Sequence, residues 1–232
     1  MALPLFPSLS SIDIFSVVSR GFVKQSISMN PKWAEENLLT IRTLMERSAL
    51  YRRALAPILL LAGVIGLVTM AAGLYFHLDS TKQFCALWLG AASAAITGAL
   101  LLARRQALKD QEPFWSSPTR RVVQALAPPL AAGMLLGILL ALRRDDLAPT
   151  VSFVWLLFYG CALHAAGFFM PRPIRRLGLL FVLSSFGFFI TYGVIWKTAD
   201  PNAHYVMGIF FGAIHLAGGT YLYLTENGKN AA

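Results

Sequence analysis

Residues 54–76 read ALAPILLLAGVIGLVTMAAGLYF, a stretch of 23 positions without a charged residue. As an α-helix that rises about 1.5 Å per residue, it is long enough to cross a hydrocarbon layer about 30 Å thick. It directly follows the basic pair Arg52-Arg53, and a basic pair precedes an apolar run again at 120–121 and at 175–176. The sequence therefore predicts an integral membrane protein.

The composition of the whole chain supports this prediction. The 232 residues are 56% hydrophobic and only 13% charged, and the mean hydropathy is +0.60. Soluble domains carry about 25% charged residues. The apolar runs are continuous and do not alternate as the strands of a membrane barrel do. The predicted fold class is all-α: a polytopic membrane bundle of six transmembrane helices, preceded by a cytoplasmic amphipathic helix.

Four segments are expected along the chain. They are a poorly ordered extension at 1–28, an amphipathic interfacial helix at 29–53, the six-helix transmembrane domain at 54–224 and a cytoplasmic tail at 225–232. One hypothesis is that translation begins at Met29, because Asn30 and Pro31 open a helix as N-cap and first helical residue. Within the domain, the spans are expected at 54–76, 84–103, 122–142, 150–170, 177–196 and 204–224.

The helix at 29–53 carries one apolar face, with Leu38, Ile41, Met45 and Ala49 at helical spacing. The plain interpretation is a helix that lies on the cytoplasmic leaflet before the first span. The alternative is a docking helix for another protein.

The distribution of Lys and Arg predicts the orientation, because these residues are enriched in cytoplasmic loops. With the N-terminus inside, 16 of the 20 Lys and Arg fall on cytoplasmic segments. Lys82, Arg143, Arg144 and Lys197 are the exceptions. We therefore expect a plasma or inner-membrane protein with both termini in the cytoplasm. The same rule accounts for the net charge of +9, so nucleic acid is not an expected partner.

Two basic pairs are followed by the same four residues, ALAP, which end at Pro57 and Pro128. This pattern suggests three parallel helical hairpins of common ancestry, although basic pairs and glycines are common at such places anyway. A proline near the first turn of a span costs little, because its missing N–H would be unsatisfied there.

Small residues recur within the spans at spacings that allow helix backbones to approach closely. We interpret them first as seams within the chain and second as faces for a homo-oligomer, which stays open. The glycines predicted to pack helices are Gly90, Gly98, Gly133, Gly137, Gly160, Gly167, Gly208, Gly212 and Gly218.

Two histidines, His164 and His215, lie well inside predicted spans, and each has a glycine three residues later. If they face each other at similar depth, they could hold a b-type haem or another metal. The favoured interpretation is a hydrogen bond from each imidazole to a neighbouring helix, without a cofactor. His77 and His204 are expected near the outer interface, in contact with water.

No signature of catalysis stands out. The spans carry no Asp, Glu, Lys or Arg at depth, which weighs against an ion-coupled transporter. Rhomboid-type intramembrane proteases also have six spans, but they need a serine where this chain has Gly160-Cys161-Ala162. Cys85 and Cys161 are expected to be small packing residues and not a disulfide or a metal site.

Three stretches carry a resemblance to a known group: Leu39–Arg47, Glu112–Ser116 with Arg120, and Gly208-x-x-x-Gly212-x-x-His215 with Tyr221. On these residues, the chain from Met29 to Tyr223 resembles an uncharacterised group of bacterial six-span membrane proteins. The resemblance implies the six-span topology and the late start, and it implies no activity.

The predicted function is a membrane scaffold, sensor or accessory protein without enzymatic chemistry. Its basic cytoplasmic face would contact the lipid bilayer and either a soluble protein or anionic lipid. The alternatives are the haem or metal protein described above and a passive carrier of a small molecule. The residues predicted at this face are Arg42, Arg47, Arg52, Arg53, Arg104, Arg105, Trp115, Arg120, Arg121, Arg175 and Arg176.

Overall fold

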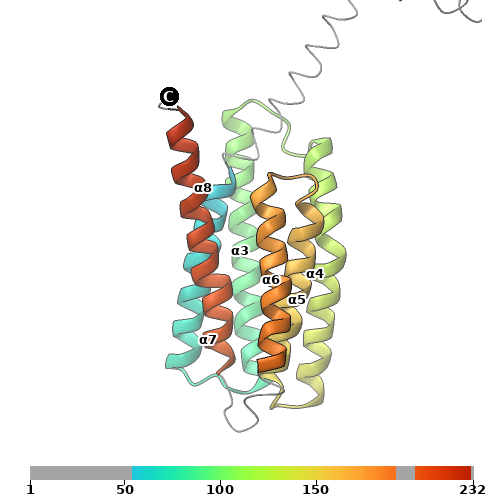
Figure 1. Cartoon of the computed structure of the whole chain (residues 1–232). Coiled ribbons are helices and arrows are strands. Elements are labelled where there is room, and N and C mark those ends of the chain that lie inside the picture. Colours follow the sequence, from blue (N-terminus) through green and yellow to red (C-terminus); the bar gives the residue numbers. More distant parts are fainter. Residues whose placement is uncertain (1–53, 192–201, 231–232) are drawn as a thin grey trace, which may run out of the picture. The chain divides into compact units, whose positions relative to one another are not determined.

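The computed structural model of this chain describes residues 54–191 and 202–230, with side chains through Thr225. Its assigned elements within these ranges are helical (Figure 1). Six helical segments are long and apolar enough to cross a membrane, as the sequence predicts. The expected extension at 1–28 and the amphipathic helix at 29–53 lie outside the described residues, together with Arg42, Arg47, Arg52 and Arg53.

Some spans differ in length from the prediction. The first span is Ala54–Tyr75. It is followed by α3 (Thr81–Lys109), α4 (Ser117–Arg143), α5 (Ala148–Ala166) and α6 (Arg172–Ile190). The sixth span, Ala203–Thr225, includes α7 (Ala203–Met207), the π-helical segment η2 (Gly208–Ile214) and most of α8 (His215–Asn230). Helices α3 and α4 extend beyond their predicted apolar cores, because the polar residues at their ends continue the helix.

Helix α4 corrects one expectation about the repeated ALAP sequence. Because the helix begins at Ser117, Pro128 and Pro129 lie in its interior and not near its first turn. An interior proline lacks one backbone hydrogen bond, which membrane helices tolerate when neighbours satisfy the freed carbonyl. The argument that Pro128 is harmless because of its position is therefore wrong.

Helix α5 is the central helix of the described bundle, since it packs along both α4 and α6 and also contacts α3 and α7. The core around it contains aromatic rings from three other helices: Phe84 and Trp88 of α3, Phe181 of α6 and Phe211 of η2. Phe84 and Phe181 are fully buried. Aromatic rings supply the packing contacts that hold helices together where lipid removes the hydrophobic drive.

Two seams bring helix backbones into close contact through glycine. Between the first and sixth spans, a Cβ at Gly66 would lie 2.6 Å from the Phe211 carbonyl oxygen. Between α5 and α6, a Cβ at Gly160 would lie 2.7 Å from the Val182 nitrogen, and Gly178 faces the His164 backbone. No side chain fits at these positions, so the seams depend on glycine.

The predicted packing glycines divide by their surroundings. Close neighbours surround Gly98 (Leu61), Gly133 (Phe158), Gly137 (Trp155), Gly160 (Val182), Gly167 (Arg175), Gly208 (Met70) and Gly212 (Leu67). Gly218 makes only an ordinary contact, 3.8 Å from Leu59. Gly90 differs, because a Cβ there would meet nothing within 4 Å. It therefore belongs to no seam between described helices. Gly63, Gly66, Gly73, Gly178 and Gly219 pack closely but were not among the predicted residues.

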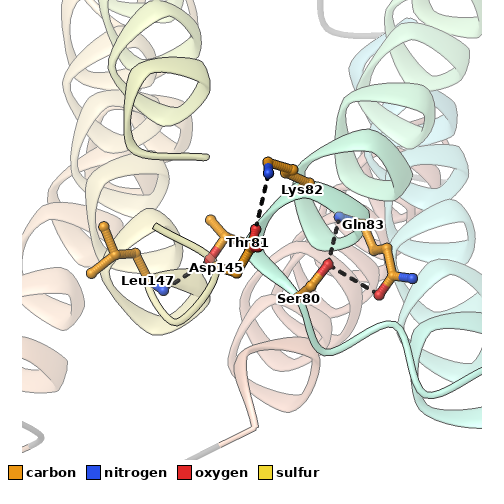
Figure 2. Close-up of polar contacts among 6 residues, drawn as sticks. All are labelled: Ser80, Thr81, Lys82, Gln83, Asp145 and Leu147. Atoms are coloured by element: carbon orange, nitrogen blue, oxygen red, sulfur yellow. Dashed lines mark hydrogen bonds and ion pairs between the residues drawn. The ribbon is translucent and has the colours of Figure 1, made fainter. Parts of the chain in front are cut away.

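At one end of the bundle, polar contacts join the connection before α3 to the connection before α5. We call this end, together with the start of α7, the paired end (residues 76–83, 143–149 and 202–204). The Thr81 backbone N–H donates to the Asp145 carbonyl (3.0 Å), and the Thr81 hydroxyl accepts from the Leu147 N–H (2.8 Å; Figure 2). Lys82 pairs with the Asp145 carboxylate at 3.6 Å. Arg144 binds Asp146, and this hydrogen bond lowers the pKa of the Asp146 carboxyl.

Replacing Thr81 by valine tests this connection. Valine keeps the shape of threonine, but it leaves the Leu147 N–H without its acceptor at a position where Thr81 is fully buried. We expect a loss of about 1–2 kcal/mol in the free energy of unfolding, measured by SDS titration in mixed micelles. Ser80→Ala is the matched control: it removes the N-cap of α3 at a half-exposed position and should cost about 0.5–1 kcal/mol. Equal losses in the two variants would contradict a special role for Thr81.

Candidate functional site

The sixth span carries two buried imidazoles, and the first of them, His204, lies at the paired end. Asn202 caps α7, and its side chain accepts from the His204 backbone N–H at 2.9 Å. The His204 side chain is 1% exposed, so the prediction that it contacts water is wrong. His77 is exposed, as predicted.

Both ring nitrogens of His204 have partners. Nδ1 accepts from the Trp88 indole N–H at 3.1 Å, and Nε2 lies 3.0 Å from the Leu78 carbonyl oxygen. An indole nitrogen only donates and a carbonyl only accepts, so these bonds require the neutral imidazole with its proton on Nε2. Trp88 and Leu78 together fix one tautomer of His204.

His215, the first residue of α8, is fixed in the opposite tautomer. Its Nδ1 lies 3.3 Å from the Phe210 carbonyl oxygen, which can only accept, so the proton is on Nδ1. Nε2 then accepts from the Tyr159 hydroxyl at 2.7 Å. The imidazole is 1% exposed and stacks on the Phe211 ring, 5.8 Å between centroids. Its bond to Phe210 connects the imidazole to the π-helical segment η2, and such segments are often found at functional sites.

His164 has different surroundings. It lies in the last turn of α5 and is half-buried. Its Nδ1 donates to the Arg175 carbonyl at 3.3 Å, and its ring meets Phe168 edge-on. His164 therefore faces α6, whereas His215 contacts Tyr159, five residues earlier on α5. Within the described residues, no hydrogen bond or ring contact joins the two histidines.

This arrangement does not match a haem or metal held between His164 and His215. Both nitrogens of His215 are engaged, and an axial ligand needs one nitrogen lone pair free for the metal. The described residues also contain no group of three or more His, Cys, Asp or Glu that could hold a metal ion. The favoured sequence interpretation is a hydrogen bond between each imidazole and a neighbouring helix. It agrees with the bond of His164 to the Arg175 carbonyl of α6 and of His215 to the Tyr159 hydroxyl of α5.

An absorption spectrum tests the haem hypothesis directly. For protein purified from cells with adequate haem supply, we expect no Soret band in either redox state and no stoichiometric metal. His164→Ala and His215→Ala should then leave the spectrum unchanged. A Soret band that disappears in both variants would show that the two imidazoles come together around iron, contrary to the contacts described above.

The two cysteines are both free thiols. Cys85 is buried, and its sulfur lies 3.8 Å from the Gly137 carbonyl oxygen, in agreement with a packing role. Cys161 is exposed on α5, so the prediction that it is a packing residue is wrong for this position.

A cavity of about 260 Å³ opens at the paired end. Its polar lining comes from Asp79, Asn202 and His204, and the Asn202 amide donates to Asp79 at 3.3 Å. Phe84 and Pro149 contribute to the apolar wall. This cavity lies at a loop end of the bundle.

The opposite end, formed by residues 104–121 and 167–176, is strongly basic, and we call it the basic end. Its cations are all exposed: Arg104, Arg105, Lys109, Arg120, Arg121, Arg172, Arg175 and Arg176. None of them forms a salt bridge with another described residue. Trp115 lies among them and is 58% exposed, as expected for a residue at the membrane interface.

Sequence reasoning missed the polar partners of the buried histidines, Trp88 and Tyr159. The available signal was weak: each is an aromatic residue with one polar atom inside an apolar run, and such an atom usually finds a partner when buried. The partner of each could not be predicted, because Trp88 and His204 are 116 positions apart in sequence, and Tyr159 and His215 are 56 apart.

No protein-family model, no curated protein and no solved structure matches this chain. The resemblance to bacterial six-span proteins therefore stays a prediction.

Proposed function

We propose that this multi-pass protein resides in a bacterial inner membrane and acts as a scaffold, sensor or accessory protein without catalytic chemistry of its own. Both termini would be cytoplasmic, and the basic end would contact a soluble protein or anionic lipid. The observation that carries the proposal is the difference in charge between the two ends of the bundle.

At the paired end, charges are compensated within the chain. Lys82 pairs with Asp145, and Arg144 pairs with Asp146. At the basic end, eight exposed cations gather at one end of the helices, and none makes a salt bridge with another described residue. Clusters of exposed cations at one end of membrane helices favour the cytoplasmic side and attract anionic surfaces.

Single cysteines test the orientation. In a background with Cys85→Ala and Cys161→Ala, Ser117→Cys places a thiol at the basic end and Asp79→Cys at the paired end; both positions are exposed. A membrane-impermeant maleimide added to intact spheroplasts should label Asp79→Cys at once and Ser117→Cys only after permeabilisation. The reverse pattern would contradict the proposal.

Photo-cross-linking in cells tests the scaffold role. A photoreactive amino acid in place of Trp115, which is exposed at the basic end, should give a discrete adduct with a protein or a phospholipid. The same substitution at Tyr205, which is 55% exposed at the start of the sixth span near the paired end, is the matched control and should not give the adduct seen at Trp115. Identical adduct patterns at the two positions would contradict a partner at the basic end.

A further inference from the structure

The turn between α5 and α6 concentrates three of the cations at the basic end. Arg172, Arg175 and Arg176 are all exposed on the first turns of α6. Residues at spacings of three and four share one face of a helix, so the three guanidinium groups can reach one ligand. They also lie at the N-terminus of α6, where the helix dipole adds positive potential.

This turn is held firmly by α5. The His164 ring donates to the Arg175 carbonyl at 3.3 Å. The backbones of Gly167 and Arg175 are so close that a Cβ on Gly167 would lie 2.6 Å from the Arg175 Cα. The position of the arginine cluster is therefore fixed by contacts that do not involve its charged groups.

Aromatic rings flank the arginine cluster. Phe168 is 66% exposed and Phe169 is 49% exposed. The Arg175 guanidinium carbon lies 5.3 Å from the centroid of the Phe168 ring, in a cation–π contact. This contact orients the Arg175 guanidinium. The exposed Phe169 ring can then meet an apolar group of a ligand that binds this guanidinium.

The combination of charge and apolar surface identifies the ligand. Three guanidinium groups match phosphate, which accepts forked hydrogen bonds from arginine. Exposed phenyl rings beside them, at the end of a membrane helix, match acyl chains and not a fully hydrated ion. We propose that the α5–α6 turn binds an anionic phospholipid, with its phosphate on Arg172, Arg175 and Arg176 and its acyl region against Phe168 and Phe169. This inference deepens the proposed function and rests on it for the identity of the leaflet.

Native mass spectrometry of the full chain tests the site. The protein is purified in neutral detergent and titrated with phosphatidylglycerol or with zwitterionic phosphatidylcholine. The variant Arg172→Gln/Arg175→Gln/Arg176→Gln should bind phosphatidylglycerol on the order of 10- to 100-fold more weakly than the parent, since each cation near a membrane surface contributes about fivefold. The matched control Arg104→Gln/Arg105→Gln/Arg120→Gln loses the same charge at the same end and should stay within about threefold of the parent.

Two further variants separate the features of the site. Phe168→Ala keeps every charge but removes the cation–π contact, and it should weaken phosphatidylglycerol binding about two- to fivefold. Replacing the three arginines by lysine keeps the charge and the solubility of the helix end, so it should bind between the parent and the glutamine variant. Thermal unfolding of each variant is the control for misfolding, and we expect unfolding midpoints close to that of the parent.

Several outcomes would overturn the inference. Equal loss in the two triple glutamine variants would show general attraction to the basic end and not a site at the turn. Equal binding of phosphatidylcholine and phosphatidylglycerol would remove the role of lipid charge. Displacement of the lipid by millimolar inorganic phosphate would show that free phosphate suffices. Because lipid retention in detergent does not depend on membrane orientation, its failure is distinguishable from failure of the cysteine-labelling test.

Discussion

Replacing Gly66 by leucine should separate the first and sixth spans and lower the free energy of unfolding by about 3 kcal/mol or more. A Cβ at Gly66 would lie 2.6 Å from the Phe211 carbonyl oxygen and 2.8 Å from the Gly212 nitrogen. Both atoms belong to the backbone, so no rotamer change can make room and the sixth span must move. Inserting extra carbons into a packed interface typically costs about 1–3 kcal/mol, and more when the backbone must shift.

Gly90→Leu is the matched control for Gly66→Leu. Both positions lie inside membrane helices, but a Cβ at Gly90 would meet nothing within 4 Å. Leucine there should be neutral or stabilising by up to about 1 kcal/mol, because glycine is the poorer helix former. SDS titration in mixed micelles, followed by circular dichroism, measures both variants. Similar unfolding midpoints for the two variants would contradict the close approach of the first and sixth spans.

Replacing His204 by alanine should cost about 3 kcal/mol of unfolding free energy. The substitution removes a fully buried ring and leaves two groups without partners, the Trp88 indole N–H and the Leu78 carbonyl. Large-to-small core substitutions lower the unfolding free energy by about 2–5 kcal/mol, and a buried polar group left without a partner lowers it further. Hydrogen bonds between membrane helices contribute only about 0.6 kcal/mol on average, so most of the loss should come from packing.

Two other variants resolve the role of His204. His77→Ala changes an exposed histidine near the same end and should stay within about 0.5 kcal/mol of the parent. Trp88→Phe keeps a large ring but loses the indole donor, so its loss of unfolding free energy should lie between those of His204→Ala and His77→Ala. The same mixed-micelle titration measures all three. A loss for His204→Ala no larger than that for His77→Ala would contradict the buried position of His204.

The sequence by itself determined the class of the fold and the number of spans. Uncharged runs such as 54–76 are long enough to cross a bilayer. In lipid, the backbone N–H and C=O groups of a continuous apolar run find hydrogen-bond partners within the run only when it is a helix. The sequence also indicated most of the packing glycines, since small residues at regular spacing are what close helix contact requires. These features are local in the chain, so they can be predicted without knowing its neighbours.

Only the tertiary structure decided which helices meet at those glycines. Gly90 and Gly160 occur in similar sequence patterns, yet Gly160 faces α6 and Gly90 faces open space. The difference depends on where α4 and α6 are placed, and local spacing carries no information about that placement.

The histidines show the same division. The sequence identified His164 and His215 as polar residues that need partners in an apolar environment. It could not tell that Tyr159 would reach His215 and that the Arg175 carbonyl would reach His164. It also placed His204 in water near the outer interface, since this residue begins the predicted span 204–224. The fold instead encloses His204 between Trp88 and the Leu78 carbonyl, and burial of this kind is set by helices distant in sequence.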